Sequence, residues 1–294
     1  MKNRLKVAIV QHACSTQLRE NQKYLASAIT QAAAQGSQLI VLPELHNYPY
    51  FCQSENECYF DLAEPIPGPS TQQLARLARN NQVVIVASLF EKRASGLYHN
   101  TAAVFESDGE IAGIYRKMHI PDDPGYYEKY YFAPGDTGFE PIQTSVGKLG
   151  VLICWDQWFP EAARLITLAG AELLIYPTAI GWDPESATKT QRIERDAWIT
   201  IQRAHAIANG LPIVVANRCG QENDPEENSS GINFWGSSFV AGSQGEILVQ
   251  ADTSPTTLEV CINLRETEKT RRSWPFLRDR RVDAYFDLLK QYID

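Results

Sequence analysis

Short runs of apolar, often β-branched residues recur along the chain and alternate with longer segments in which apolar residues follow helical spacing. In the first half, alternating strands and helices are predicted over residues 6–11, 21–35, 37–43, 71–80 and 82–89. Runs that are apolar throughout are typical of strands with both faces buried. The pattern therefore predicts an α/β protein in which helices cover a sheet.

A hairpin and a second alternating series follow. Residues 98–105 and 109–117 are predicted to pair around the Asp108-Gly109 turn. Later strands and helices are predicted over residues 149–153, 160–169, 171–176, 189–209 and 211–216, and a last antiparallel pair over 231–240 and 245–250. The long segments 45–70 and 118–139 are rich in aromatic residues and proline, and we expect them to be functional loops.

The two halves of the chain resemble each other. The segment 34–43 is similar to 168–177, with glycine and proline in matching places, and 80–88 is similar to 209–217. This similarity indicates two fused copies of one strand–helix–strand–helix–strand unit. Each copy would have one sheet face covered by helices, and packing the two bare faces together gives a four-layer αββα sandwich with an internal pseudo-twofold repeat.

Composition narrows the class of protein. The chain has 294 residues, of which 44% are hydrophobic and 21% charged, as expected for a globular protein with a large core. The start of the chain has no signal-peptide pattern and no stretch reaches membrane-spanning length, so we expect a cytoplasmic protein. Six scattered cysteines without a Cys-x-x-Cys pair predict reduced thiols and no metal or other cofactor. The net charge of −8 disfavours nucleic acid and membranes as partners and favours a cationic small molecule.

Three chemically active side chains, Glu44, Lys117 and Cys154, follow predicted strands. Open α/β sheets bind ligands at the carboxyl ends of their strands, so we expect these side chains to meet. A buried carboxylate can accept a thiol proton, and a lysine can stabilise the oxyanion formed when sulfur attacks an amide-like carbon. The backbone N–H of Trp155 would be a second oxyanion donor. The set predicts hydrolysis of an amide-like bond through a cysteine nucleophile.

The same positions carry a resemblance to a known family. The segments Leu42-Pro-Glu44, Tyr115-Arg-Lys-Met-His119 and Gly150-Val-Leu-Ile-Cys-Trp-Asp156 occur in the order found in the nitrilase, or carbon–nitrogen hydrolase, superfamily. The resemblance implies the αββα sandwich and a catalytic set of Glu44, Lys117 and Cys154. It also implies that Glu128 positions the substrate and the lysine.

Within that superfamily the chain is most similar to the N-carbamoylputrescine amidohydrolases, over segments 119–136, 177–184 and 271–281. This implies cleavage of N-carbamoylputrescine to putrescine, CO2 and ammonia, a step of polyamine biosynthesis, through a thiocarbamoyl intermediate on the cysteine. A substrate that ends in an ammonium favours acidic and aromatic side chains at the far end of the pocket. The expected substrate-binding residues are Tyr50, Asp122, Asp123, Trp155, Ala179, Trp182 and Asp183.

Three other interpretations stay open. The chain could hydrolyse N-carbamoyl amino acids or another linear amide, in which case Arg192 or Arg195 would bind a substrate carboxylate. His46 and His119, each two residues past a proposed catalytic residue, would suit a Cys–His hydrolase. The non-enzyme alternative is a catalytically inactive interaction module with the same fold.

The end of the chain extends beyond the repeat. Residues 265–294 contain Arg-Arg runs and an amphipathic segment over 282–293. This segment is longer than completion of a core requires, and members of the superfamily pair through their long faces and tails. We therefore expect a single hydrolase domain over 1–264 and a tail over 265–294 that contacts a neighbouring subunit in a homo-oligomer, at least a dimer.

Overall fold

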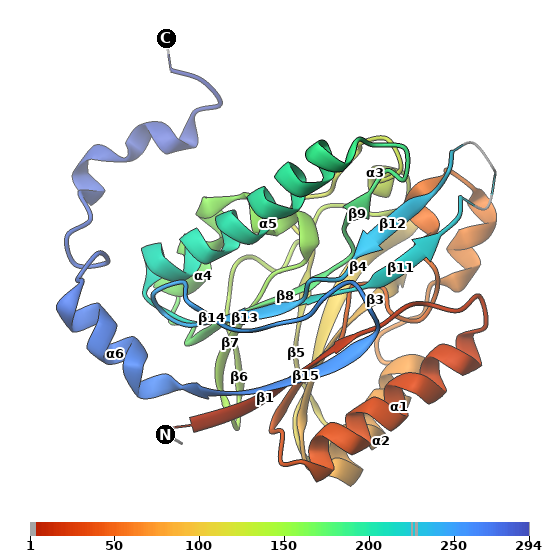
Figure 1. Ribbon diagram of the computed structural model, residues 1–294, viewed down its shortest axis with the longest axis horizontal. Coiled ribbons are helices and arrows are strands. Elements are labelled where there is room, and N and C mark those ends of the chain that lie inside the picture. The colour runs from red at the N-terminus through yellow and green to blue at the C-terminus, as the bar shows by residue number, and fades with distance from the viewer. Residues whose placement is uncertain (1–3, 225, 227–228, 294) are drawn as a thin grey trace.

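The computed structural model describes residues 4–224, 226 and 229–293 of the chain. Within them, two six-stranded sheets pack face to face and carry helices on their outer surfaces (Figure 1). The strands of the first sheet are, in spatial order, β15 (Thr256–Asn263), β1 (Arg4–Gln11), β2 (Leu39–Val41), β3 (Val84–Ala94), β4 (Leu97–Phe105) and β5 (Ile111–Arg116). Those of the second sheet are β14 (Ile247–Gln250), β13 (Phe239–Ala241), β10 (Ile213–Asn217), β8 (Leu173–Thr178), β7 (Gly147–Val151) and β6 (Ile142–Thr144).

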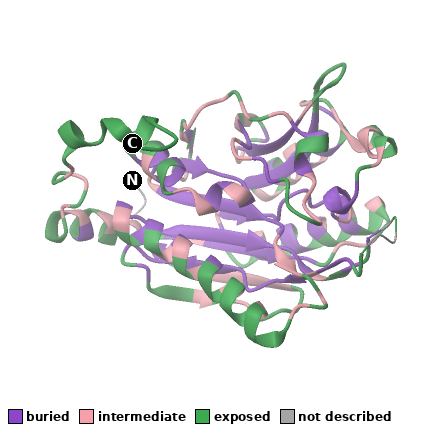
Figure 2. Cartoon of the chain, turned by 90° about the horizontal axis from the view of Figure 1, so that it is seen from above, coloured by how far each residue is buried: buried purple, intermediate pink, exposed green. Residues whose placement is uncertain are grey.

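Two helices cover each sheet, namely α1 (Leu18–Ala34) and α2 (Pro69–Asn81) on the first and α4 (Pro160–Leu168) and α5 (Thr188–Asn209) on the second. The strands between these layers are buried (Figure 2). Alternate residues of a strand point to opposite faces, so in β1 Val7 and Ile9 belong to the core between the sheets, and Ala8 and Val10 to the core beneath α1 and α2. The predicted four-layer αββα sandwich is confirmed.

The two sheets repeat one pattern of strand pairing, as the similarity between the halves predicts. In each, three parallel strands (β1, β2 and β3, or β7, β8 and β10) are followed by two antiparallel ones, and a further antiparallel strand lies beside the first. The matching glycines Gly36 and Gly170 follow α1 and α4 with φ of 93° and 104°. Glycine adopts this left-handed conformation without a steric penalty, and both helices end there.

The predicted last antiparallel pair is only partly correct. Residues 231–240 form two strands, because Gly236 and Ser237 turn the chain at φ of 54° and 55°. The first of these strands, β12 (Ile232–Trp235), lies between β11 (Cys219–Glu222) and β9 (Gly181–Trp182) in a small third sheet. The second, β13, pairs with β14 as predicted. The last strand of the chain is β15, which pairs with β1 and was not predicted.

Short helices occupy the loops near the strand ends. They are η1 (Phe51–Gln53), η2 (Glu57–Leu62), α3 (Glu128–Tyr131) and η3 (Cys154–Trp158). The first three lie within the two aromatic-rich segments that the sequence marks as functional loops. An aromatic cluster that includes Phe51, Phe90 and Tyr131 joins these segments to the end of the first sheet.

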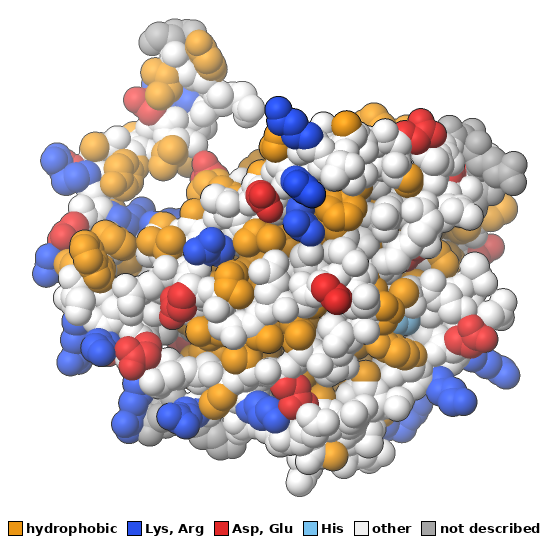
Figure 3. Space-filling view, viewed as in Figure 1, with side chains coloured by type: hydrophobic (Ala, Val, Ile, Leu, Met, Phe, Trp, Pro, Cys, Tyr) orange, Lys and Arg blue, Asp and Glu red, His pale blue; other side chains and the backbone are white. Residues whose placement is uncertain are grey.

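The end of the chain projects from the sandwich. Helix α6 (Leu264–Ser273) leads away from β15, and the short turns η4 (Val282–Ala284) and η5 (Phe286–Leu289) follow it (Figure 1). Hydrophobic side chains are exposed along this tail (Figure 3), among them Trp274, Phe286, Leu288, Leu289 and Tyr292. None of the helices in the described part of the chain is long and apolar enough to cross a membrane.

Candidate active site

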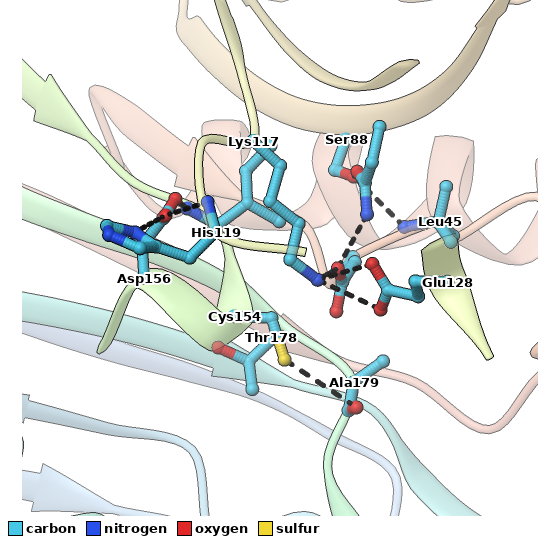
Figure 4. A network of polar contacts seen from close by, with 12 residues as sticks. Leu45, Ser88, Lys117, His119, Glu128, Cys154, Asp156, Thr178 and Ala179 are labelled. Carbon is cyan, nitrogen blue, oxygen red and sulfur yellow. Dashed lines mark hydrogen bonds and ion pairs between the residues drawn. The ribbon is translucent and has the colours of Figure 1, made fainter. Parts of the chain in front are cut away.

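A buried lysine lies between two buried carboxylates at the ends of the sheets (Figure 4). Lys117, directly after β5, donates to Glu44 Oε1 at 2.8 Å and to both oxygens of Glu128 at 2.9 and 2.7 Å. The exposed fractions of the three side chains are 0%, 0% and 1%. Because burial without partners would be prohibitive for any of these charges, their mutual contacts hold the cluster together.

Glu44 follows β2 and has one oxygen without a partner. Oε1 accepts hydrogen bonds from Lys117 and from Asn100 Nδ2, the latter at 2.6 Å. The Asn100 amide is fixed in turn by the Ser88 hydroxyl, which donates to it at 2.8 Å. No described group hydrogen-bonds to Oε2, although this atom is buried. Glu44 is therefore held in place through one oxygen, and the other is available to accept a proton.

Cys154 begins the short helix η3 after β7, in a left-handed conformation with φ of 41°. Its thiol donates to the Ala179 carbonyl at 3.7 Å (Figure 4). The charges of Glu44, Lys117 and Glu128 all act on this thiol, so the sulfur lies close to the cluster. Burial first, and then the Glu44 carboxylate, raise the thiol pKa well above its usual value, against the lowering effect of Lys117. The resting thiol is therefore protonated, and its attack on a substrate requires a base.

Glu128 begins α3 and links the lysine to the loops above it. Tyr50 donates its hydroxyl proton to Glu128 Oε1 at 2.6 Å. Burial raises the Glu128 pKa to about 7, in opposition to Lys117 and with a further contribution from Glu44. Burial alone would lower the Lys117 pKa, but the two carboxylates raise it well above its usual value. The lysine therefore keeps its charge, and the carboxylate cluster carries the group that titrates near neutral pH.

A buried arginine supports the turn that follows Glu44. Arg218, which lies between β10 and β11, donates to the carbonyls of Glu44 and Leu45 at 2.9 and 3.0 Å and pairs with Glu222 at 2.7 Å. Leu45 is also in the left-handed region, at φ of 48°. The guanidinium therefore holds a strained turn next to the carboxylate. No sequence motif marks Arg218, because the backbone carbonyls that it binds lie far away along the chain.

The residues expected to bind substrate do not all meet. Tyr50 contacts Glu128 directly, and Ala179 contacts Cys154. Trp155 is half-buried next to Cys154. Trp182 donates its indole N–H to the Gln191 carbonyl, and its ring contacts that of Trp235 at an angle of 55°, so the Trp182 ring packs against α5 and β12. The remaining three, Asp122, Asp123 and Asp183, are exposed in the surrounding loops.

An open cavity of about 840 Å³ lies outside the cluster. Its lining includes four acidic residues, the exposed Glu55, Asp183 and Glu185 and the buried Asp224, and contains no lysine or arginine among the described residues. Tyr126 also lines it, and the Tyr126 ring lies 5.6 Å from that of Tyr50, the residue that binds Glu128. The rings of Tyr126 and Tyr50 therefore lie in succession between this acidic cavity and Glu128.

Neither histidine of the alternative interpretation reaches the thiol. His119 Nδ1 lies 2.7 Å from Asp156 Oδ1, and its ring stacks on Phe159. His46 is buried, and burial lowers its pKa to about 3. Among the described residues, no hydrogen bond joins either ring to Cys154. The geometry favours the carboxylate as the partner of the cysteine.

Comparison with known proteins agrees with this geometry. Residues 6–272 match the protein family described as carbon-nitrogen hydrolase. A crystal structure of a carbon–nitrogen hydrolase from Helicobacter pylori G27 superposes with a TM-score of 0.97 at 54% sequence identity, over 99% of this chain and 100% of that one.

Two relatives show which activities occur nearby in the family. The N-carbamoylputrescine amidase of Arabidopsis thaliana is 44% identical over 96% of this chain and 94% of its own length. A citrullinase of Francisella tularensis is 41% identical over 98% of this chain and 99% of its own. Both are similar to the chain along nearly its whole length.

Proposed function

From the premise that this chain belongs to the carbon–nitrogen hydrolase family, we propose that it cleaves the ureido group of N-carbamoylputrescine to give putrescine, CO2 and ammonia. Support comes from the amidase relative and from the acidic cavity beside the site, which suits the terminal ammonium of this substrate. The observation that carries the reaction type is the buried, unpartnered Oε2 of Glu44 beside a protonated cysteine.

In the first half of the reaction, Glu44 Oε2 accepts the thiol proton as the Cys154 sulfur attacks the ureido carbon. The carbonyl oxygen becomes an oxyanion, which Lys117 Nζ and the backbone N–H of Trp155 stabilise. Trp155 is in the first turn of η3, where helical N–H groups have no partner within the helix. When the intermediate collapses, the amine nitrogen of putrescine leaves with the proton from Glu44, and the carbamoyl group stays bound to sulfur.

In the second half, Glu44 removes a proton from water, whose oxygen attacks the thioester-like carbon. The carbon–sulfur bond breaks, the thiol regains its proton, and the released carbamic acid decomposes to CO2 and ammonia. Glu128 orients Lys117 throughout, because it contacts the ammonium with both oxygens. A single carboxylate thus serves as base and acid in each half.

Three substitutions test these roles. We expect Glu44→Gln, Lys117→Met and Cys154→Ala to lower kcat by about a thousandfold or more, with circular dichroism of the wild-type form. Cys219→Ala, which removes a buried thiol outside the cluster, is the matched control and should keep wild-type turnover. Turnover within tenfold of the wild type in any folded variant of the three would contradict the role given to that residue.

Citrullinase activity is the second candidate, because one relative has that name. Citrulline differs from N-carbamoylputrescine only by a carboxylate on the carbon that bears the ammonium. The described lining of the cavity offers acidic side chains and no cation, so this carboxylate would be repelled. We therefore expect kcat/KM for N-carbamoylputrescine to exceed that for citrulline by at least about tenfold.

Substitution of the cavity acids tests the same point. Asp183→Asn and Glu185→Gln should raise KM for N-carbamoylputrescine and narrow the gap to citrulline, whereas Glu140→Gln, an exposed acid elsewhere, should not. Steady-state kinetics on both substrates, with N-carbamoyl-β-alanine as a third, give the ratios. A preference for citrulline in the wild type would favour the second candidate.

We also propose that residues 1–264 act as one hydrolase domain in the cytoplasm and that the tail from residue 265 binds a second copy of the chain. The exposed hydrophobic side chains of the tail support this, since a surface of this kind is usually covered in an assembly. Light scattering should give at least a dimer for the full chain. A chain that ends at Ser273 should form an assembly with fewer subunits. If the ratio of assembly mass to chain mass were the same for the truncated and the full chain, the proposal would be contradicted.

A further inference from the structure

One carboxylate outside the catalytic cluster connects the lysine to the cysteine. Asp156, two residues after Cys154, has an exposed fraction of 0% and receives four contacts. Oδ2 accepts the Tyr115 hydroxyl at 2.8 Å and the Ile153 backbone N–H at 2.9 Å. Oδ1 accepts the backbone N–H of His119 at 3.0 Å and lies 2.7 Å from that residue's Nδ1.

The donors to the Asp156 carboxylate lie next to the catalytic residues in the sequence. Tyr115 and His119 lie two residues before and two residues after Lys117. Asp156 therefore holds the chain on both sides of the lysine. Through Ile153 it also holds the residue immediately before the cysteine. A buried carboxylate with several hydrogen bonds has little freedom to move. Asp156 therefore fixes the backbone next to Lys117 and next to Cys154 relative to each other.

The cysteine requires such support. A residue with a side chain at φ of 41° is strained, and this conformation persists only where the surroundings determine it. The Ile153–Asp156 hydrogen bond closes the turn around Cys154. The His119 ring lies parallel to Phe159, with ring centres 3.8 Å apart and an angle of 6°, and so packs against the residue that precedes α4.

Asp156 and His119 do not take part in the chemistry directly. Figure 4 shows Asp156 and His119 on one side of Lys117 and Glu128 on the other. The hydrogen bond of the Cys154 thiol goes to Ala179. The two residues are therefore placed to act through the lysine and the cysteine rather than on a substrate.

We propose that the Asp156 carboxylate, with His119 as its ring partner, is a positioning device that fixes the nucleophile against the lysine. The proposal rests on the catalytic roles proposed above. Lys117 lowers the pKa of the Cys154 thiol. If the two side chains were no longer held in their relative positions, that pKa should rise and attack by the sulfur should be slower.

Two substitutions of His119 separate its hydrogen bond from its ring. His119→Phe keeps a planar ring for Phe159 and loses the Nδ1 contact, whereas His119→Asn places an amide nitrogen near the Nδ1 position and loses the ring. Tyr115→Phe removes one donor to Asp156 and little else. Ser243→Ala, which loses a buried hydroxyl contact with Thr270, is the control for the loss of a single hydrogen bond.

The first readout is the rate at which iodoacetamide alkylates Cys154, measured from pH 6 to pH 10 by mass spectrometry of the peptide that contains it. Cys58 and Cys261 are exposed and would also react, so all variants carry Cys58→Ser and Cys261→Ser. The second readout is kcat and KM for N-carbamoylputrescine. The midpoint of thermal unfolding monitors stability.

We expect His119→Phe and Tyr115→Phe to shift the alkylation profile to higher pH and to lower kcat about tenfold, with KM changed less than about twofold. His119→Asn should recover most of both, and Ser243→Ala should match the parent chain. The proposal is overturned if the alkylation rates or kcat of both His119→Phe and Tyr115→Phe stay within about twofold of the parent. It is also overturned if His119→Asn and His119→Phe lose kcat equally. A parent chain that is alkylated at Cys154 but cleaves no ureido substrate would overturn the proposed function and leave the alkylation comparison valid.

Discussion

Cys154 lies where an L-residue with a side chain is disfavoured, in the left-handed region at φ of 41°. For such a residue the conformation costs about 1–2 kcal/mol relative to a right-handed one. Glycine would avoid this cost but has no sulfur. The nucleophile is therefore held at the expense of stability, a common feature of functional sites.

A glycine–alanine comparison measures this strain. We expect Cys154→Gly to be more stable than Cys154→Ala by about 1 kcal/mol, because alanine keeps the Cβ that is strained at positive φ. At Ala163, inside α4, the order reverses, and Ala163→Gly should be less stable than the wild type by about 1 kcal/mol or more. Urea unfolding gives both differences. If alanine were the more stable residue at position 154, the cysteine would not be strained.

Of the site, the sequence predicts the residues whose position in an element is visible. Glu44, Lys117 and Cys154 each follow an apolar strand, and the structure brings them to one place. Asn100 could not be predicted, because its role depends on contact with Glu44 across the sheet and its strand shows only an ordinary polar residue. Asp156 is present in a recognised motif, but its partners Tyr115 and His119 come from a segment that only the folded chain brings next to it.

At the scale of elements, the long apolar strands and the helices are predictable because each has a clear period, and several end at glycine or proline, as α1 does before Gly36 and α4 before Gly170. Strand β15 is not, since it is an edge strand with mostly half-exposed residues and no continuous apolar run. The division of 231–240 into β12 and β13 depends on two residues at positive φ, and only one of them is glycine. Edges and turns are therefore the least predictable parts of this fold.

The ion pair of Arg218 with Glu222 fastens β11 to the turn after β2. Removal of one member leaves the other charge buried, so Arg218→Met should destabilise the chain by about 3–5 kcal/mol. The double variant Arg218→Met with Glu222→Gln should recover part of that loss, because no charge remains uncompensated. Chemical denaturation of the two single variants and the double variant measures the coupling. Strictly additive losses would show that the pair does not act as a unit.

At the scale of the whole molecule, stability should depend on buried histidines. Burial lowers the pKa of His12 to about 4 and that of His46 to about 3. Between about pH 6.5 and pH 4 the unfolded chain therefore binds protons that the folded chain does not. The free energy of unfolding should fall as the pH is lowered through this range. Glu128, whose pKa is raised to about 7, has the opposite effect over part of the same range.

Because these effects oppose each other, the contribution of His46 is measured by comparing the free energy of unfolding of the wild type with that of a variant without this histidine. His46→Gln removes one of the histidines, so its free energy of unfolding should fall less than that of the wild type between pH 6.5 and pH 4, by an amount on the order of 3 kcal/mol. Urea unfolding at pH 6.5, 5.5, 4.5 and 4.0 gives the two curves. Parallel curves would mean that His46 is protonated in the folded chain.

The catalytic cluster draws its members from both sheets, with Glu44 and Lys117 from the first and Cys154 from the second. The repeated unit therefore carries only part of the machinery in each copy, and neither half of the chain would be an enzyme alone. Turnover therefore requires that the two halves be packed together, and its rate measures how much of the protein is assembled. If the chain were cut between β5 and β6, recovered turnover on mixing the two fragments would measure their affinity, as in a split reporter protein.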